Sequence, residues 1–367
     1  MRLFFVLCIV IGAITLGMLA FWPQITGFSE FSAIEESNGT RIGAILPLSG
    51  SGSRTGEAAR NGMLLALEDL HSEVELLFDD SQNDAKTALS AMQKLRSVNR
   101  VQLFVTWLSA SSNALSPVVE SEKSVLLYGS AVDPPAEKYS FVFKNHTSVA
   151  ADCKILAHLL QGKKGAGFMA NHDSTHLCLA EFKATGFSFP VEFFQKGETD
   201  YRTSLSKLKA IHPEFLLIRT NTIETENILR QLREIDFGPV QIVCPTVGAV
   251  ACDFEGVSEF SDVLQNAIGT DFYLGEENPK VKAFLERYRS RFGATAIADA
   301  VYGYEDVFIL HQAASSCKDK EPFSVCVQNA LLSQEFEGLD GKIRFDANGV
   351  IQRPSYVLHF DGNRWVK

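Results

Sequence analysis

The sequence lacks any run of basic residues, and its overall charge is acidic. Lysine and arginine together number 34 against 44 aspartates and glutamates, which gives a formal net charge of −10 at neutral pH. A chain of this kind has no positive field that would attract the phosphates of a nucleic acid. We therefore expect no nucleic-acid partner.

The signature motifs of the common enzyme and metal-site classes are missing as well. The sequence contains no nucleophile elbow, Walker loop, HExxH or dinucleotide fingerprint, and no CxxC pair with the spacing of a zinc site. Strict repeats and low-complexity tracts are also absent. We expect no enzyme activity, no cofactor and no bound metal.

Two clusters of residues admit a metal site as an alternative interpretation. His172, His176 and Cys178 could share one face of a helix, because positions four apart lie on the same side. The acidic turn at residues 79–84 could hold a cation. We favour a polar strand-to-helix loop for the first cluster, and turn and capping chemistry for the second.

The N-terminal segment is the longest apolar stretch of the chain. Residues 3–22 contain no charged side chain and are long enough to cross a membrane as a helix. Arg2 precedes them and acidic residues follow at positions 30–36, so the positive-inside tendency places the rest of the chain outside the cytoplasm. We interpret residues 1–28 as an uncleaved signal anchor and 29–40 as a linker. A cleaved signal peptide is the alternative.

Six of the seven cysteines follow this segment, in a compartment where disulfides persist. Cys317 and Cys326 flank a short charged loop between two helical patterns and form the first candidate pair. Cys244 and Cys252 form the second. A buried free thiol is the alternative at every position, and the sequence does not define the connectivity.

The rest of the sequence alternates short apolar runs with longer stretches of helical period, the pattern of a parallel α/β sheet. Residues 41–46 indicate a first strand, and apolar side chains between 59 and 70 then recur on one helical face. Residues 73–78 indicate the next strand, and Asp84 could cap the helix that follows. The rhythm restarts with a helix at 149–161, which predicts a second sheet. A length of 367 residues also favours two domains.

Several segments carry a family resemblance. They are an opening strand, loop and helix, an Asp-rich turn, a Thr-Asp-Tyr motif before a helix, and two later helical segments, at 42–50, 56–62, 78–84, 198–201, 228–233 and 283–293. Each segment alone is a weak signal, but the ordered set is specific. Across residues 41–367 the sequence resembles the periplasmic type I solute-binding proteins of the leucine/isoleucine/valine-binding kind.

The resemblance implies an α/β fold of two Rossmann-like lobes, each with a parallel central sheet, joined by a three-strand hinge. A ligand would bind in the cleft between the lobes, at the carboxyl ends of the strands, and hinge closure would bury it. The chain would cross between the lobes near residues 144–147, 270–274 and 349–352. We therefore assign 41–145 and 274–349 to the first lobe, and 146–273 and 350–367 to the second.

The resemblance also implies a function. The expected activity is capture of a small solute in the periplasm or outside the cell, with delivery to the permease and ATPase of an ABC-type importer. A membrane-anchored sensor that reports the ligand to a partner such as a kinase is the alternative. A lobe pair that binds no ligand and serves as an assembly surface is a third interpretation.

Two loops after predicted strands combine hydroxyls with backbone N–H groups at a helix N-terminus, an arrangement that can bind an anion. In family members these loops hold the carboxylate of the ligand. Ser111 and Ser130 are the strongest candidates here. A capping role of Ser111 and Ser112 for a helix that begins near Asn113 is the alternative. The candidate contacts of these loops, and of the opening loop, are Ser49, Trp107, Leu108, Ser109, Ser111, Ser130, Ala131 and Val132.

Other positions depart from the pattern of the family. Val132 replaces a typical threonine, and Thr246 stands where members use an acid to meet the ammonium group of the ligand. The aromatic positions that cover the ligand align with Thr55, Thr175 and Asn221, which are small and polar. Because an ammonium without a partner is costly to bury, we expect a polar solute of the amino-acid, amide or carboxylate type rather than leucine.

Two arginines, Arg54 and Arg219, lie near loops that could meet an anionic solute. We interpret both as solvated surface side chains, which is the usual state of arginine. Contact with an anion is the alternative for each.

Overall fold

The computed structural model describes residues 39–367 apart from 72–73, 131–138, 196, 221, 248–251, 255, 272–274, 276–277 and 354. The expected anchor at residues 1–28, and the linker as far as residue 38, lie outside the described residues. Within the described part of the chain, no helix combines the length and the apolar character that a membrane span requires.

The first sheet has five parallel strands among the described residues, in the order β2-β1-β3-β4-β5. Their register brings the carboxyl ends to one edge, where Leu46 pairs with Asp80 and Trp107 pairs with Gly129. The strands are mostly apolar because both faces of a parallel sheet are covered. Their bounds are β1 Thr40–Leu46, β2 Val74–Asp80, β3 Leu103–Trp107, β4 Val125–Gly129 and β5 Val142–Lys144.

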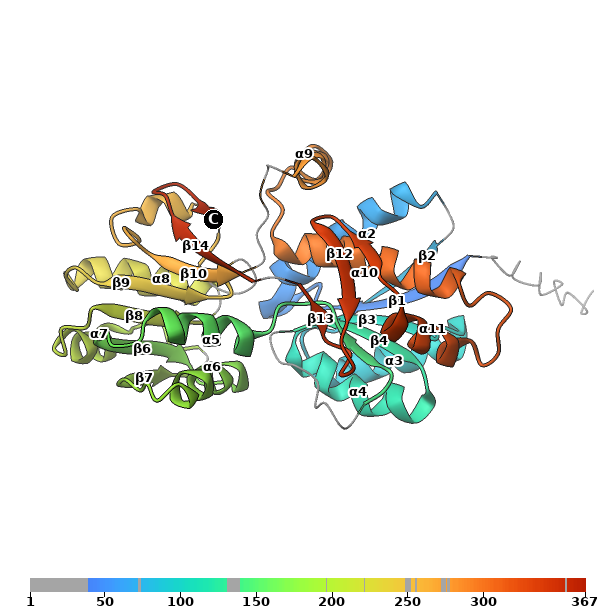
Figure 1. Cartoon of the computed structure of the whole chain (residues 1–367), viewed down its shortest axis with the longest axis horizontal. Coiled ribbons are helices and arrows are strands. Elements are labelled where there is room, and N and C mark those ends of the chain that lie inside the picture. Colours follow the sequence, from blue (N-terminus) through green and yellow to red (C-terminus); the bar gives the residue numbers. More distant parts are fainter. Residues whose placement is uncertain are drawn as a thin grey trace, which may run out of the picture. The chain divides into compact units, whose positions relative to one another are not determined.

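Helices cover both faces of this sheet (Figure 1). Ile45 and Phe104 face α3 and α4, whereas Ile42 and Val105 face α2 and α9–α11, as the period of two along a strand requires. The helices from the end of the chain therefore complete the first lobe. The bounds are η1 Gly50–Gly52, α2 Ser53–Asp69, α3 Ala85–Asn99, α4 Ser109–Glu122, α9 Pro279–Phe292, α10 Ala298–Ser315 and α11 Phe323–Ser333.

Helices α2 and α10 come from distant parts of the sequence and pack closely. A Cβ atom at Gly62 would lie 1.8 Å from the carbonyl oxygen of Ala300, and one at Gly303 would lie 2.2 Å from that of Ala59. Any larger residue at either position would push the helices apart. This contact holds the C-terminal helices on the first sheet.

The second sheet has seven strands among the described residues, in the order β15-β14-β10-β9-β8-β6-β7. Strands β6–β10 run parallel, and β14 and β15 are antiparallel additions at one edge. Helices α5 and α6 pack on one face, and α7 and α8 on the other. The strand bounds are β6 Gly165–Ala170, β7 Val191–Phe194, β8 Phe215–Arg219, β9 Gln241–Pro245, β10 Ile268–Asp271, β14 Tyr356–Phe360 and β15 Trp365–Val366, and the helix bounds are α5 Val149–Leu159, α6 Asp173–Ala184, α7 Arg202–Lys209, α8 Thr222–Glu234 and η3 Val257–Phe260.

The chain passes between the two large sheets three times. It leaves the first sheet after β5, returns between β10 and α9, and leaves again between β13 and β14. Strand β13 belongs to a small antiparallel sheet whose core residues pack with the first lobe. The α/β class and the two lobes are thus confirmed, while the lobe boundaries assigned from the sequence stay a prediction. The small sheet consists of β11 Phe336–Gly338, β12 Gly341–Phe345 and β13 Ile351–Gln352.

Three disulfides among the described residues join neighbouring elements. Cys317–Cys326 links the end of α10 to α11, and Cys244–Cys252 links β9 to the loop that follows it. The first and second candidate pairs of the sequence analysis are therefore bonded in the structure. A third bond, Cys153–Cys178, joins α5 to α6. The sequence did not predict this pair, because two cysteines on separate helices carry no local sign of their proximity.

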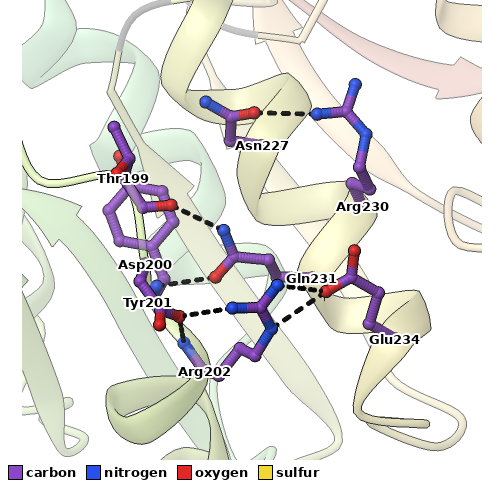
Figure 2. A network of polar contacts seen from close by, with 8 residues as sticks. All are labelled: Thr199, Asp200, Tyr201, Arg202, Asn227, Arg230, Gln231 and Glu234. Carbon is purple, nitrogen blue, oxygen red and sulfur yellow. Dashed lines mark hydrogen bonds and ion pairs between the residues drawn. The ribbon is translucent and has the colours of Figure 1, made fainter.

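Figure 2 shows the polar network that fixes the loop before α7. Gln231 of α8 accepts a hydrogen bond from the backbone N–H of Tyr201 at 2.6 Å and donates one to the carbonyl of Thr199 at 2.7 Å. Arg202 adds exposed ion pairs on the outer side of the same loop. The Thr-Asp-Tyr motif of the family resemblance therefore has a structural role, since the buried amide of Gln231 satisfies its backbone groups.

Candidate functional site

The loop after β1 is held by the acidic turn after β2. Asp80 accepts hydrogen bonds from the backbone N–H of Leu48 at 2.9 Å and from the hydroxyl of Ser49 at 2.6 Å. Burial opposes ionisation of Asp80, but these bonds and one from Gln82 outweigh it and lower the pKa of Asp80. Asp84 caps α3 by accepting from the N–H of Thr87 at 2.8 Å. The capping and turn interpretation of this cluster is confirmed.

The loops after β3 and β4 meet at a pair of serine hydroxyls. The Oγ atoms of Ser109 and Ser130 lie 2.8 Å apart, and the N–H of Leu108 donates to the carbonyl of Gly129 at 2.8 Å. Leu108 has φ +67° and ψ 154°, a conformation that is strained for any residue with a side chain. Such strain persists only where the surroundings impose it, and here it turns the chain from β3 directly into α4.

Helix α4 begins at Ser109, four residues before the expected start. Its N-cap is Leu108, so the interpretation of Ser111 and Ser112 as caps of a helix that begins near Asn113 is wrong. Ser112 lies inside the first turn, where its hydroxyl donates to the carbonyl of Leu108 at 3.0 Å. The hydroxyl of Ser111 is fully buried and has no partner among the described residues. This hydroxyl therefore has unused hydrogen-bonding capacity in the described part of the chain.

Trp107 lies beneath this edge. Its indole Nε1 donates to a carboxylate oxygen of Asp299 at 2.7 Å, and a Cβ atom at Gly129 would lie 2.5 Å from its ring. Burial raises the pKa of Asp299 to about 7, against the opposing effects of the Trp107 bond and the charge of Arg54. The second oxygen of Asp299 has no partner among the described residues. No sequence motif marks this aspartate, which lies in the first turn of α10.

The carboxyl edge of the second sheet contains a buried arginine. Arg219 ends β8, a strand with neighbours on both sides, and its side chain is 1% exposed. The interpretation of Arg219 as a solvated surface residue is therefore wrong, whereas Arg54 is indeed exposed. The Nη2 group of Arg219 donates to Ser174 Oγ at 3.2 Å, and its Nε and Nη1 groups have no partner among the described residues.

Burial lowers the pKa of Arg219 to about 10, and the charges of Asp152 and Asp271 oppose this effect. The guanidinium therefore keeps its proton at neutral pH. A permanent cation lies at the carboxyl edge of the second sheet.

Polar residues at the N-terminus of α6 surround this arginine. His172 is the N-cap residue, and its Nδ1 lies 3.0 Å from Ser174 Oγ and 3.2 Å from Thr175 Oγ1. Burial, followed by the charge of Arg219, lowers the pKa of His172 to about 4, so the imidazole is neutral at pH 7. Cys178 is bonded to Cys153 and is therefore not free to bind a metal, and the described residues contain no group of three metal-binding side chains.

Thr246 follows β9 in a left-handed conformation with φ +56°. Its hydroxyl donates to Asp152 at 2.9 Å, and Ser355 donates to the other oxygen of the same carboxylate. Burial raises the pKa of Asp152, while these two bonds and the charges of Arg219 and Lys144 favour its ionised form. Asp152 therefore lies next to Thr246, and both of its carboxylate oxygens already accept a hydrogen bond.

Buried polar contacts also link the passages between the lobes. Asn145, in the first passage, accepts from Arg353 at 3.0 Å and donates to Asp306 at 2.7 Å. Arg353, in the third passage, forms an ion pair of 2.5 Å with Glu305 in which both side chains are almost fully buried. Because these residues come from separate passages and from α10, the network ties the hinge segments to the first lobe.

A hollow of about 570 Å³ lies at the opposite edge of the second sheet, near the amino ends of β8 and β9. Its cation, Arg233, already makes an ion pair with Asp262 and a hydrogen bond to the carbonyl of Glu259. Ligands of open α/β sheets bind at the carboxyl ends of the strands. We therefore place the candidate site at the carboxyl edges and not in this hollow.

The structure describes only some of the remaining candidate residues. Thr55 is half-buried in the first turn of α2, and Thr175 is fully buried in the first turn of α6. Ala131, Val132 and Asn221 lie outside the described residues. The ligand contacts proposed for all of these residues stay predictions.

Solved structures of known proteins share this fold. A leucine binding protein LivK from Thermotoga maritima is 22% identical, with 89% of this chain and 98% of that chain covered and a TM-score of 0.76. LivJ from Streptococcus pneumoniae, solved with isoleucine, is 19% identical over 89% and 97% of the two chains, with a TM-score of 0.75. A solute binding protein from Rhodopseudomonas palustris, solved with benzoate, is 14% identical over 89% and 95%, with a TM-score of 0.78.

A sequence model of the periplasmic binding proteins matches residues 39–364. This match spans nearly the whole described part of the chain and shows the family directly. The family is one of extracytoplasmic solute-binding proteins, which are not enzymes. The chain therefore belongs to the periplasmic binding protein family.

Proposed function

We propose that this protein captures a small polar solute of the amino-acid, amide or carboxylate type in the cleft between its lobes and delivers it to an ABC-type importer. The observation that carries the proposal is the gathering of unsatisfied polar groups at the carboxyl edges of both sheets. The buried hydroxyl of Ser111 and the guanidinium of Arg219 have free hydrogen-bonding capacity among the described residues. Buried groups of this kind are costly unless something binds them.

The first lobe would hold the solute through hydroxyls and backbone N–H groups. Ser109 and Ser130 bring two loops together, and the strained turn at Leu108 directs the N-terminus of α4 toward the same edge. The relatives support this class of ligand, because leucine, isoleucine and benzoate, which appear in their names, all contain a carboxylate. The partner of the closed form would be a permease with its ATPase, and residues 1–28 would anchor the protein to the membrane.

A thermal-shift screen of the purified full chain tests this function. We expect at least one amino acid, amide or carboxylate to raise the melting temperature, since a ligand at 100 times its Kd stabilises by about 2.7 kcal/mol. Polyols serve as a control class. Failure of every solute in the three classes would contradict the proposal, and stabilisation by leucine above all others would contradict the expectation that the pocket has changed.

Recovery of partners tests the role in transport. We expect a permease and an ATPase to co-purify with the full chain from membranes in the presence of the solute. Recovery of a kinase or a cyclase instead would replace transport with sensing.

A further inference from the structure

Arg219 is a buried cation whose charge is only partly matched by the described protein. One of its nitrogens donates to Ser174, and its Nε and Nη1 groups have no partner among the described residues. The charges of Asp152 and Asp271 act on it through space. A guanidinium in this state carries an uncompensated desolvation cost, which an anion at the free nitrogens would relieve.

The hydrogen-bond chain on one side of Arg219 supplies no negative charge. Because the hydroxyl of Ser174 accepts from Arg219, its own hydrogen is directed to His172 Nδ1, 3.0 Å away. The proton of the neutral imidazole then lies on Nε2. This chain orients the guanidinium without neutralising it.

The nearby acids limit the charge of any anion that binds here. Both oxygens of Asp152 accept hydroxyl hydrogens, from Thr246 and Ser355, so this carboxylate is already engaged in the protein. The charges of Asp152 and Asp271 still act on Arg219 through space. They would repel a second negative charge on a ligand, because such interactions are strong where water is excluded. Since these two acids already face two cations, Arg219 and Lys144, a ligand with two negative charges would be matched less well than one with a single charge.

We propose that Arg219 anchors the carboxylate of an organic monoanion at the carboxyl end of β8, beside the N-terminus of α6. The inference rests on the proposed function and names its solute class. A guanidinium matches the planar carboxylate in shape and charge, and the positive end of the 12-residue helix α6 adds to the attraction. Since Arg219 is buried in the described conformation, the solute would reach it when the lobes part.

Asp152, the buried acid next to Thr246, has no free oxygen to meet an ammonium group. Thr246 occupies the position of the expected acid, and Asp152 behind it is already bonded through both oxygens. An α-amino acid would therefore bury its ammonium without a partner. The preferred solute is a monocarboxylate whose remaining part is uncharged.

Matched solutes test this inference on the wild-type full chain by isothermal titration calorimetry. The sets are 4-methylpentanoate, 4-methylpentanamide and leucine, together with benzoate and benzamide, and inorganic phosphate is an additional probe. We expect each carboxylate to bind at least about 10-fold more tightly than its amide, because a charge-assisted hydrogen bond is about twice as strong as a neutral one. We also expect the carboxylates to bind more tightly than leucine and phosphate.

Variants then test whether Arg219 is the residue that binds the carboxylate. Arg219→Gln should weaken carboxylate binding about 10- to 100-fold and abolish the preference over the amide. Arg219→Lys should have an intermediate effect, because it keeps the charge but loses the planar donor set. Arg230→Gln is the matched control, since Arg230 is an exposed arginine of the same lobe, paired with Glu226. It should leave binding unchanged.

Melting curves without solute separate an anchor from a structural residue. Arg219→Gln should melt cooperatively like the wild type but at a somewhat lower temperature, because it loses the hydrogen bond to Ser174 and a charge that favours the ionised Asp152. Loss of a residue that the fold requires would abolish the cooperative transition. Equal binding of carboxylate and amide by the wild type, or a retained preference in Arg219→Gln, overturns the inference and leaves the solute-binding function intact. If the wild type binds no solute of any class, the proposed function fails as well.

Discussion

The carboxyl edges of the two sheets hold different chemistry. The edge of the first lobe presents serine hydroxyls and helix N-terminal N–H groups, held by the Ser109–Ser130 contact and by the strained turn at Leu108. The edge of the second lobe contains buried charges, above all Arg219 and Asp152. We call the first the neutral edge and the second the charged edge. In the proposed function, the charged edge would therefore decide which solute binds.

The largest expected effect concerns Asp299, a buried acid near the first edge whose pKa is raised to about 7. Between its ordinary value of 3.8 and about 7, the folded chain binds more protons than the unfolded chain, so stability falls as the pH rises through this window. Asp299→Asn keeps the acceptor for Trp107 and removes this dependence. At pH 8 it should be more stable than the wild type by roughly 4 kcal/mol, from about 1.4 kcal/mol per pKa unit.

Urea unfolding at pH 4, 6 and 8 measures this effect. The curves of the wild type and Asp299→Asn should converge near pH 4 and separate toward pH 8. Parallel curves at all three values would show that the acid near the first edge is not held in its neutral form.

The next effect concerns the disulfides, two of which lie in the second lobe. Loss of Cys153–Cys178 in a double alanine variant should lower the free energy of unfolding by about 3 kcal/mol, because the bond constrains the unfolded chain. Its loop spans 25 residues against 9 for Cys317–Cys326, so its loss should cost about 1 kcal/mol more. Calorimetric unfolding of both double variants gives the order, and a larger loss for Cys317–Cys326 would contradict it.

A smaller effect is expected at the neutral edge itself. Ser111→Ala combined with Ser130→Ala should weaken the best solute of the screen by about 1 to 3 kcal/mol, the sum of two ordinary hydrogen bonds. The melting temperature without solute should change little for Ser111, whose hydroxyl has no partner among the described residues. Calorimetric titration measures the affinity, and an unchanged value in the double variant would remove both serines from the site.

The smallest effect concerns Arg54, whose charge acts on Asp299 of the first lobe and on Asp253 after β9. Arg54→Gln should move the midpoint of the Asp299 pH dependence slightly upward and change stability by only a few tenths of a kcal/mol, because the side chain is exposed. The same urea series measures this shift. A downward shift would show that Arg54 does not favour the ionised acid.

The regular elements could be predicted because their signals are local. The helix after the second strand was expected from its apolar face and from Asp84, and the structure shows Asp84 as the N-cap of α3. The start of α4 was missed because two serines before a helical pattern are typical of a cap, whereas the strained turn at Leu108 has no sequence signal. Local sequence patterns therefore predict which helices and strands form more reliably than they predict the residue at which a helix begins in a functional loop.

The charged edge could not be predicted for a different reason. Arginine is usually exposed. Arg219 is buried because β8 lies inside the sheet, with a neighbouring strand on each side, and the sequence does not show this position. Asp152 and Thr246 are 94 residues apart in the sequence, and their contact depends on tertiary packing. The departure at Thr246 was visible in the sequence, but the buried groups behind it were not.

A crystal structure of the full chain with its tightest-binding solute tests the account most directly. The solute should lie between the lobes, with its carboxylate on Arg219 and with Ser111 or Ser130 in hydrogen-bond contact. A solute seated in the hollow beside Arg233 and Asp262, or one that touches a single lobe only, would contradict it.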